Sequence, residues 1–358
     1  MSAEAQDHVH APTDHEELAR RWAELLAEHP KLRIRAAAEA LGTGEAQLLA
    51  TQVGDGVTRL RCEPRELFEA LPELGEIMAS TRNEWAVIEK TGTYDNVDIW
   101  EHMGVVLDEE IDLRLFLSHY HSVFAVRKPV EGTERVLRSI QFFAKDGTSL
   151  HKVYAKKTKQ AEAFEALVAR FAHEDQTPGE PWIAVDPKPE ERPDEEIDVA
   201  GFQQEWRDLE DTHHFFGMLR RYDVRRTQAL RLAPEGFTER LDLDAVRVML
   251  DAASAEEVPI MVFVGSPGCI EIHTGPVRKI AEMGSWINVL DPRFNLHLQR
   301  DGVAEAWVVR KPTVDGIVTA VECFDADGGV VIMFFGKRKP GIPEDERWRD
   351  LVAKLPRA

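Results

Sequence analysis

The sequence has few of the features that mark secreted or membrane proteins. It contains only three cysteines, which stand far apart at Cys62, Cys269 and Cys323. This spacing argues against both a disulfide framework and a cysteine-rich metal site. No apolar run approaches the roughly 20 residues that a membrane-spanning helix needs. Residues 1–17 are polar and acidic without an apolar core, so we expect neither a signal peptide nor an anchor. These features together predict a cytoplasmic protein without membrane insertion.

Basic residues are outnumbered by acidic ones. The chain has 44 Lys and Arg against 64 Asp and Glu, which gives a net charge of -20. Nucleic acid is not an expected partner, because neutralising phosphates requires a basic surface. The acids are densest in residues 173–201, which are also rich in proline and poor in helical or strand periodicity. This segment is predicted to be a solvated linker.

Several common sequence motifs of enzymes are missing. The chain contains no G-x-G-x-x-G or Walker loop, so a dinucleotide-binding or P-loop domain is not expected. It also contains no H-E-x-x-H, C-x-x-C or G-x-S-x-G, which leaves the usual zinc and hydrolase templates without support.

The sequence instead repeats itself. Residues 91–129 match residues 274–312 without a gap, sharing Thr-Gly, Val-Leu-Asp and Val-Arg-Lys-Pro at matched positions. After a deletion of two residues, the Asp-Gly of 146–147 matches the Asp-Gly of 327–328. A period this long indicates a duplicated domain and not a solenoid. With 358 residues, the chain has the length of about two domains.

Each half is predicted to begin with helices and to continue with strands. Helical periodicity covers residues 15–26, 33–49, 202–220 and 227–232, and the second of these stretches is punctuated by Gly42 and Gly44. Strand-like runs follow at 84–88, 113–117, 123–126, 139–143 and 152–155, and again at 260–264, 296–298, 306–309, 318–324 and 330–335. Short turns between consecutive strands indicate antiparallel pairing. The sequence therefore predicts an α+β fold made of two tandem copies of one domain, each an antiparallel sheet with helices packed on it. The predicted boundaries are 15–172 for the first repeat, 173–201 for the linker and 202–356 for the second repeat.

The two halves differ most visibly in one strand. The first half has Asp-Leu-Arg-Leu-Phe at 112–116, where the second has Asn-Leu-His-Leu-Gln. Strand alternation places Arg114 and Phe116 on one face, opposite Leu113 and Leu115. A cation beside an aromatic ring on one face could form a pocket wall. An ordinary ion pair at a sheet edge explains the arginine equally simply.

A second candidate site is the segment Asp-Thr-His-His-Phe-Phe-Gly at 211–217. On a continuous helix, His213 would share a face with Phe216 and Gly217, while His214 would point about 100° away. Histidine among aromatic and small residues is typical of the ligand side of a haem site. A partly exposed pair of histidines near a helix start is the alternative interpretation.

Six segments in order resemble the bacterial hemin-degrading factor family of the HemS/ChuS type. They are TRNEWAVIEKTG from Thr81, IDLRLFL from Ile111, DTHHFFGMLRRYDVRRTQA from Asp211, IEIHTGPV from Ile270, WINVLDPRFNLHL from Trp286 and AWVVRKPT from Ala306. The resemblance covers roughly residues 15–351. The family consists of cytoplasmic haem-utilisation proteins built from two tandem copies of one domain, so the resemblance agrees with the duplication.

The resemblance implies a haem site made from named residues. The family's axial ligand falls on His213, in the second half, and its distal arginine falls on Arg114, in the first, with Phe116 beside it. The remaining residues that the resemblance assigns to the haem site are basic groups on the propionate side and apolar wall residues: Arg226, Lys311, Arg338, Phe263, Met333 and Phe335. Charge-assisted hydrogen bonds make basic groups chemically suitable for propionates.

The sequence departs from its relatives at three positions. Ile88 stands where many relatives have a histidine, and Met333 and Phe335 stand where some have glutamine and tyrosine. These replacements predict a drier pocket with fewer hydrogen bonds to the ligand. The asymmetry between Arg114 and its counterpart His297 predicts one haem b per chain.

Two functions remain open after this comparison. The first is a haem-binding protein of iron acquisition, which accepts imported haem and buffers or delivers it. The second is an enzyme that opens the porphyrin ring and releases iron with an external electron donor, in which Arg114 would be the distal catalytic residue. We favour the first, because release requires only one breakable axial bond and two domains that can move apart. Expected partners are a haem importer and a downstream haem-degrading enzyme or a reductase.

Overall fold

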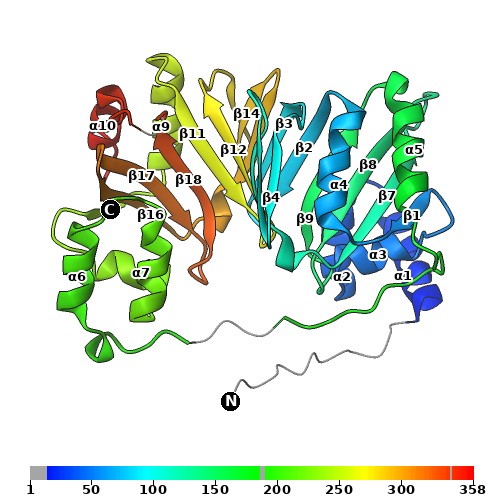
Figure 1. Cartoon of the computed structure of the whole chain (residues 1–358), viewed down its shortest axis with the longest axis horizontal. Coiled ribbons are helices and arrows are strands. Elements are labelled where there is room, and N and C mark those ends of the chain that lie inside the picture. Colours follow the sequence, from blue (N-terminus) through cyan, green and yellow to red (C-terminus); the bar gives the residue numbers. More distant parts are fainter. Residues whose placement is uncertain (1–13, 186–189, 339–340) are drawn as a thin grey trace. The chain divides into compact units, whose positions relative to one another are not determined.

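The computed structural model describes residues 14–185, 190–338 and 341–358 (Figure 1). The chain divides into two compact units. Of the described residues, unit 1 takes 14–82, 90–185 and 266–271, and unit 2 takes 83–89, 190–265, 272–338 and 341–358. Each unit therefore includes a short segment from the other half of the sequence. In the part of the chain that is described, no helix is both long and apolar enough to span a bilayer.

Unit 1 is built on antiparallel strands. Five of them are hydrogen-bonded in the order β1-β7-β8-β9-β2. Their bounds are β1 Val57–Leu60, β2 Ile77–Arg82, β7 Ser122–Pro129, β8 Val136–Phe143 and β9 Ser149–Ala155. A second antiparallel set in this unit is β4-β5-β6, with β4 Val97–Trp100, β5 Met103–Leu107 and β6 Asp112–Phe116.

Unit 2 has the same order of strands. Its five-stranded set is β10-β16-β17-β18-β11, and its three-stranded set is β13-β14-β15. The bounds are β10 Thr238–Leu241, β11 Ile260–Gly265, β13 Ile280–Met283, β14 Trp286–Asp291, β15 Phe294–Gln299, β16 Glu305–Thr313, β17 Gly316–Phe324 and β18 Val330–Gly336. Two further strands, β3 Ala86–Gly92 and β12 Cys269–Gly275, run across the sequence boundaries of the units. The repeated order confirms the predicted α+β fold of two tandem copies.

Helices cover both faces of the five-stranded set in unit 1. Alternate strand residues such as Val123 and Phe142 pack against α4 (Pro64–Ala70) and α5 (Ala161–Phe171). On the opposite face, Phe124 and Phe143 pack against α3. The helices before the sheet are α1 His15–Glu28, α2 Ile34–Leu41 and α3 Glu45–Ala50. Side chains of α1 and α2 pack together with Leu48 of α3.

The helices of unit 2 are arranged in the same way (Figure 1). Inward residues such as Val308 and Phe334 pack against α9 (Ala245–Ala255) and α10 (Glu346–Ala353). On the other face, Val309 and Ala320 pack against three short helices. These are α6 Val199–Arg207, α7 His214–Tyr222 and α8 Arg226–Arg231. The face that carries α6, α7 and α8 also carries the predicted binding residues of this unit.

The sequence-based prediction of elements was partly right. Every predicted strand run overlaps a strand of the structure, because alternating burial follows the period of two in the sequence. The helical stretch predicted over 33–49 forms two helices divided at its glycines, because Gly42 ends α2 in the left-handed conformation at φ 67° and Gly44 precedes α3. The helix predicted over 202–220 is wrong, because α6 ends at Arg207 and α7 begins only at His214. The helices α4, α5, α9 and α10 were not predicted.

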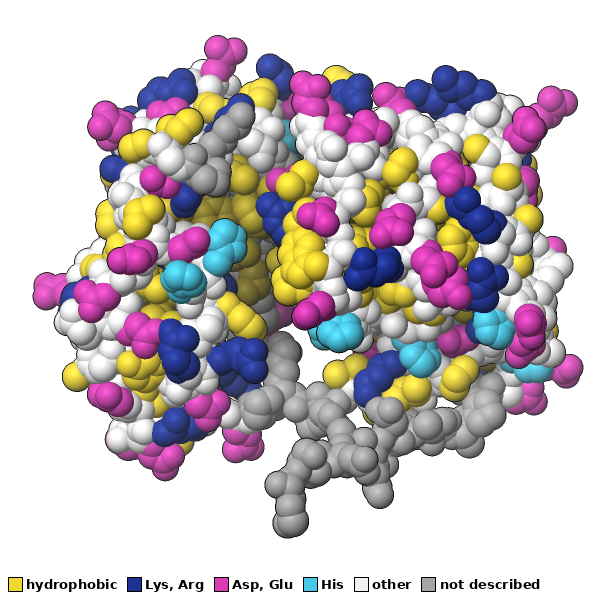
Figure 2. All heavy atoms as spheres, viewed as in Figure 1, with side chains coloured by type: hydrophobic (Ala, Val, Ile, Leu, Met, Phe, Trp, Pro, Cys, Tyr) yellow, Lys and Arg dark blue, Asp and Glu magenta, His cyan; other side chains and the backbone are white. Residues whose placement is uncertain are grey.

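Acidic and basic side chains are interspersed over the face of the molecule that Figure 2 shows. This mixture is usual for a globular chain in which 30% of the residues are charged. Asp and Glu outnumber Lys and Arg, in line with the net charge of -20.

Candidate functional site

A tight turn between α6 and α7 positions His213. The carboxylate Oδ1 of Asp211 accepts a hydrogen bond from the backbone N–H of His213 at 2.8 Å. The same oxygen lies 2.6 Å from the ring Nδ1 of His213. Because an ionised carboxylate only accepts hydrogen bonds, Nδ1 must carry the proton. In the neutral imidazole, this leaves the lone pair on Nε2, which is the form that binds metals.

The side chain of His213 is 87% exposed. It lines a cavity of about 470 Å³ together with His214 and Gly217. The other lining residues are Glu205, Asp208, Leu209, Glu210 and Arg221. The prediction that His213 lies on a continuous helix was wrong: it is the residue before α7, and both histidines line the same cavity. Phe216, expected beside it, is 64% exposed.

Three predicted wall residues lie together in unit 2. Phe263 of β11 is the register partner of Met333 of β18. The ring of Phe335, two residues further along β18, lies 4.9 Å from that of Phe263, centroid to centroid. All three side chains are only partly buried, whereas the alternate residues of both strands are fully buried in the core on the other face. They form an apolar wall (Phe263, Met333, Phe335) beside the helices α6, α7 and α8.

A buried ionic cluster adjoins this wall. The carboxylate of Glu322 accepts hydrogen bonds from Nε and Nη2 of Arg226, at 2.8 and 2.7 Å. It also accepts one from Nζ of Lys311, at 2.8 Å. Both cations lie against the ring of Phe215 in α7, at 5.6 Å for Arg226 and 4.5 Å for Lys311. The structure therefore brings Arg226 and Lys311 together, as the sequence predicted, around an acid that the sequence analysis did not single out.

The pKa values of this cluster follow from burial and mutual attraction. Burial alone would raise the pKa of Glu322, but Arg226 and Lys311 lower it to about 2. Burial lowers the pKa of Lys311, and Arg226 lowers it further, so that Glu322 only partly restores it. For Arg226, the attraction of Glu322 outweighs burial and raises the pKa. With both bases protonated, the cluster carries one net positive charge.

Arg338, the last predicted basic residue, follows β18 and is partly buried. Two other positions named in the sequence analysis, Ile88 and His297, also belong to unit 2. Ile88, which replaces a histidine of many relatives, is fully buried in the apolar core with Ala86. His297 lies on β15, where its Nδ1 is 2.6 Å from Oδ1 of Asn288.

The predicted distal residues, Arg114 and Phe116, belong to β6 in unit 1. Their side chains are partly exposed, and the alternate residues Leu113 and Leu115 are fully buried, which confirms the predicted alternation. Nη1 of Arg114 is ion-paired with Asp112 and donates to the carbonyl of Leu113 at 3.1 Å. Burial raises the pKa of Asp112 in spite of this pairing. The ion pair expected from the simpler interpretation is thus present, and the side chain of Arg114 remains 36% exposed.

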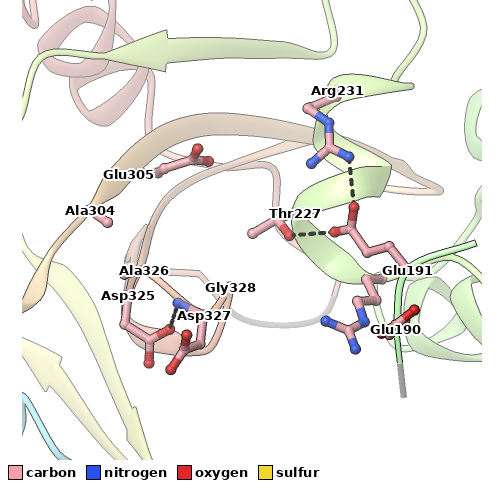
Figure 3. Close-up of a pocket in the computed structure, with 11 residues that line it drawn as sticks. Glu190, Glu191, Thr227, Arg231, Ala304, Glu305, Asp325, Ala326, Asp327 and Gly328 are labelled. Atoms are coloured by element: carbon pink, nitrogen blue, oxygen red, sulfur yellow. Dashed lines mark hydrogen bonds and ion pairs between the residues drawn. The ribbon is translucent and has the colours of Figure 1, made fainter. Parts of the chain in front are cut away.

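A larger cavity, of about 880 Å³, lies elsewhere in unit 2 (Figure 3). Charged residues line it, and two of them, Glu191 and Arg231, are ion-paired at 2.9 Å. Within the described residues, no group of three or more His, Cys, Asp or Glu side chains is placed to hold a metal ion. None of the predicted site residues lines this cavity.

Sequence reasoning missed Asp211, Phe215 and Glu322. The sequence analysis named Asp211 only as part of a motif. Its hydrogen bonds to His213 depend on the turn that interrupts the predicted helix, and this turn was not predicted. Glu322 left a stronger signal, since a lone acid in the apolar strand run of residues 318–324 must find a partner when it is buried.

Comparison with known proteins assigns the chain to one family. The family model described as the haemin-degrading HemS.ChuX domain matches residues 42–171 and again residues 223–355. The hemin transport protein HmuS of Yersinia pestis is 38% identical over 340 residues, which cover 94% of this chain and 97% of the relative.

Two solved structures cover nearly the whole chain. One is holo-PhuS, a heme-binding protein from Pseudomonas aeruginosa, with a TM-score of 0.93, 43% identity, and coverage of 97% of this chain and 100% of the other. Another is ChuS, an E. coli heme oxygenase, with a TM-score of 0.84, 36% identity, and coverage of 95% and 99%. The sequence duplication, the repeated strand order and these matches describe the same two-copy architecture.

Proposed function

The chain belongs to the haemin-degrading HemS/ChuX domain family, and from this premise we propose that it binds haem through the imidazole of His213. When bound, haem supplies an iron centre that accepts a nitrogen ligand. The observation that carries the proposal is the contact of Asp211 with Nδ1 of His213 at 2.6 Å, on a side chain that is 87% exposed. A carboxylate on Nδ1 fixes the ring orientation and makes Nε2 a stronger ligand.

The surroundings in unit 2 suit an apolar macrocycle with acidic substituents. Phe263, Met333 and Phe335 offer a partly exposed apolar surface, and thioether and aromatic groups pack well against a flat ring. Arg226 and Lys311 supply positive charge for propionates, and Arg338 is proposed to join them. Phe215 connects this region to His213, since its ring lies under both cations and it stands two residues after the histidine.

Arg114 and Phe116 of unit 1 are proposed as distal residues on the strength of the family resemblance. Because the matched strand of unit 2 has His297 and Gln299 at these positions, the two copies are chemically different. This asymmetry supports the proposal of one haem b per chain.

Between the two functions that the relatives' names suggest, transport and degradation, we favour transport. The chain would accept imported haem in the cytoplasm and buffer it or pass it to a downstream enzyme. Met333 and Phe335 offer no hydrogen-bond donor side chains, and Ile88 lies in the apolar core, which leaves Arg114 as the main polar candidate on the distal side. Ring opening depends on donors positioned where charge develops, whereas release depends on one axial bond.

Degradation is the alternative function, with Arg114 as its distal catalytic residue and a separate reductase as electron donor. The two functions are separated by incubating the haem complex with a physiological reductant and catalase, with and without dioxygen. Transport predicts a Soret band that persists and haem that can be passed to an acceptor apoprotein. Catalase-insensitive conversion to a defined tetrapyrrole over several turnovers, abolished in Arg114→Ala, would establish degradation instead.

A further inference from the structure

A ligand cannot reach the carboxylate of Glu322. Its side chain is fully buried, and three hydrogen bonds from Arg226 and Lys311 occupy both carboxylate oxygens. A buried acid held by two cations cannot turn toward solvent without leaving both of them uncompensated, which is strongly unfavourable. Glu322 can therefore affect a ligand only through Arg226 and Lys311.

The two cations are not equivalent in their access to solvent. The side chain of Arg226 is 23% exposed, whereas that of Lys311 is 5% exposed. A ligand can therefore contact Arg226 directly. Lys311 is buried and contributes only its positive charge. Because the cluster holds two bases and one acid, an additional anion at Arg226 would balance its charge.

The surroundings of Arg226 limit the chemistry of that anion. Its Nη2 lies 3.5 Å from Sδ of Met333, a member of the apolar wall. The guanidinium therefore borders the apolar surface, and a planar guanidinium pairs best with a carboxylate or a phosphate. An amphiphilic ligand with an apolar body and a carboxylate edge fits both features.

The first unit has the opposite charge at the matched place. By the spacing of 181 residues that relates the Asp-Gly turns, Arg226 corresponds to Glu45 of α3, and Glu322 corresponds to Gln141. Glu45 is ion-paired with Lys152 of β9 at 2.8 Å. The base on the helix, Arg226, and the acid that binds it, Glu322, therefore have no counterparts of the same kind in unit 1.

From this geometry we infer that Glu322 is a positioning residue, which holds Arg226 and Lys311 so that Arg226 can bind a carboxylate of the ligand at the edge of the apolar wall. This inference rests on the proposed haem binding, because the propionates of haem are such carboxylates. It gives Glu322 a role opposite to the one its charge suggests, since an acid near an anion should by itself weaken binding.

The variant Glu322→Gln separates these two roles. If Glu322 acted only as a negative charge, its removal would strengthen haem binding. If it positions the two cations, haem binding weakens although a negative charge has been removed. A purely structural role would weaken the binding of every porphyrin equally, so the dimethyl ester of haem, which lacks the carboxylates, is the necessary second ligand.

We would titrate the parent chain, Glu322→Gln and Glu344→Gln with haem and with its dimethyl ester in the same dilute detergent, following the Soret band. Glu344 is a buried acid of unit 2 outside the cluster, bonded to Thr319 and Arg349, and is the matched control. The parent and the control should bind haem about tenfold to a hundredfold more tightly than the ester, the range for a charged hydrogen bond. In Glu322→Gln, this preference should fall to roughly threefold or less, with ester binding unchanged.

Glu322→Gln binding haem as tightly as the parent, or more tightly, would overturn the inference. Equal losses for haem and ester would overturn it too. If this variant does not fold, Glu322→Asp keeps the charge but shortens the reach, and the same loss of preference is expected. Failure of the parent to bind haem at all would refute the proposed function, whereas haem binding without preference over the ester would refute only this inference.

Discussion

The carboxylate Oδ1 of Asp211 lies 2.6 Å from Nδ1 of His213. The same oxygen accepts the backbone N–H of His213, so that the acid fixes both the turn and the imidazole. This double contact lowers the pKa of Asp211, first through the backbone hydrogen bond and then through the ring. The acid therefore stays ionised near neutral pH and keeps the proton on Nδ1.

Asp211→Asn should weaken haem binding by about tenfold to a hundredfold, the usual cost of losing the partner of a metal-bound histidine. The amide still can cap the turn, but it no longer carries the charge that strengthens Nε2 as a ligand. Haem titration and the reduction potential of the complex measure the effect, and the potential should rise. Asp208→Asn, at another acid that lines the same cavity, should behave as the parent, and a larger loss there than in Asp211→Asn would contradict the assignment.

Arg114→Ala should keep haem bound while changing the spin state of the iron and the rates at which external ligands bind. The reason is that the proposed role of Arg114 lies on the distal side, away from the axial bond of His213. Electronic absorption and stopped-flow ligand binding provide the measurement. Asp112→Asn, which removes only the partner of the ion pair, is the control. If Arg114→Ala simply failed to fold, the residue would have a structural role in β6 and no distal one.

His151 makes the stability of unit 1 depend on pH. Its ring is buried, with Nδ1 2.8 Å from Oγ1 of Thr81 and Nε2 2.6 Å from the hydroxyl of Tyr94. Burial lowers the pKa of His151 from 6.5 to about 3. The unfolded chain therefore takes up a proton at a pH where the folded chain does not. The resulting stability is fully present above pH 6.5 and is lost as the pH falls toward 3.

Between pH 7.5 and pH 5, this one group should remove about 2 kcal/mol from the free energy of unfolding. Urea unfolding of the parent and of His151→Gln at both pH values measures the difference, because the variant cannot titrate there. We expect a smaller loss of stability on acidification in His151→Gln. Equal losses in the two proteins would show that His151 is protonated in the folded state.

The duplication and most strands were predictable from the sequence. Matching segments reveal the duplication, and the alternation of apolar and polar residues reveals the strands. The alternation in residues 112–116 gave the correct faces of Arg114 and Phe116, since strand geometry fixes them without reference to the rest of the fold. Phe263, Met333 and Phe335, which the family resemblance named, come together because β11 and β18 pair in register.

The ionic cluster was not predictable to the same degree. Arg226 and Glu322 are 96 residues apart, and their pairing depends on how α8 packs on the sheet. The position of His213 was misjudged for a related reason. Helical periodicity continues through residues 202–220, but α6 ends at Arg207, and Asp211 holds the backbone of His213 in the turn before α7. A hydrogen bond from a short polar side chain to the backbone cannot be recognised from the spacing of apolar residues.

The central claim is that His213 is the axial ligand, and haem titration of His213→Ala tests it most directly. His214→Ala and His297→Ala are matched controls, one lining the same cavity and the other on β15. We predict that His213→Ala alone loses tight binding and shifts the Soret maximum, while both controls saturate at one haem per chain as the parent does. A His213→Ala chain that titrates as the parent does, with the loss appearing in either control, would contradict the account.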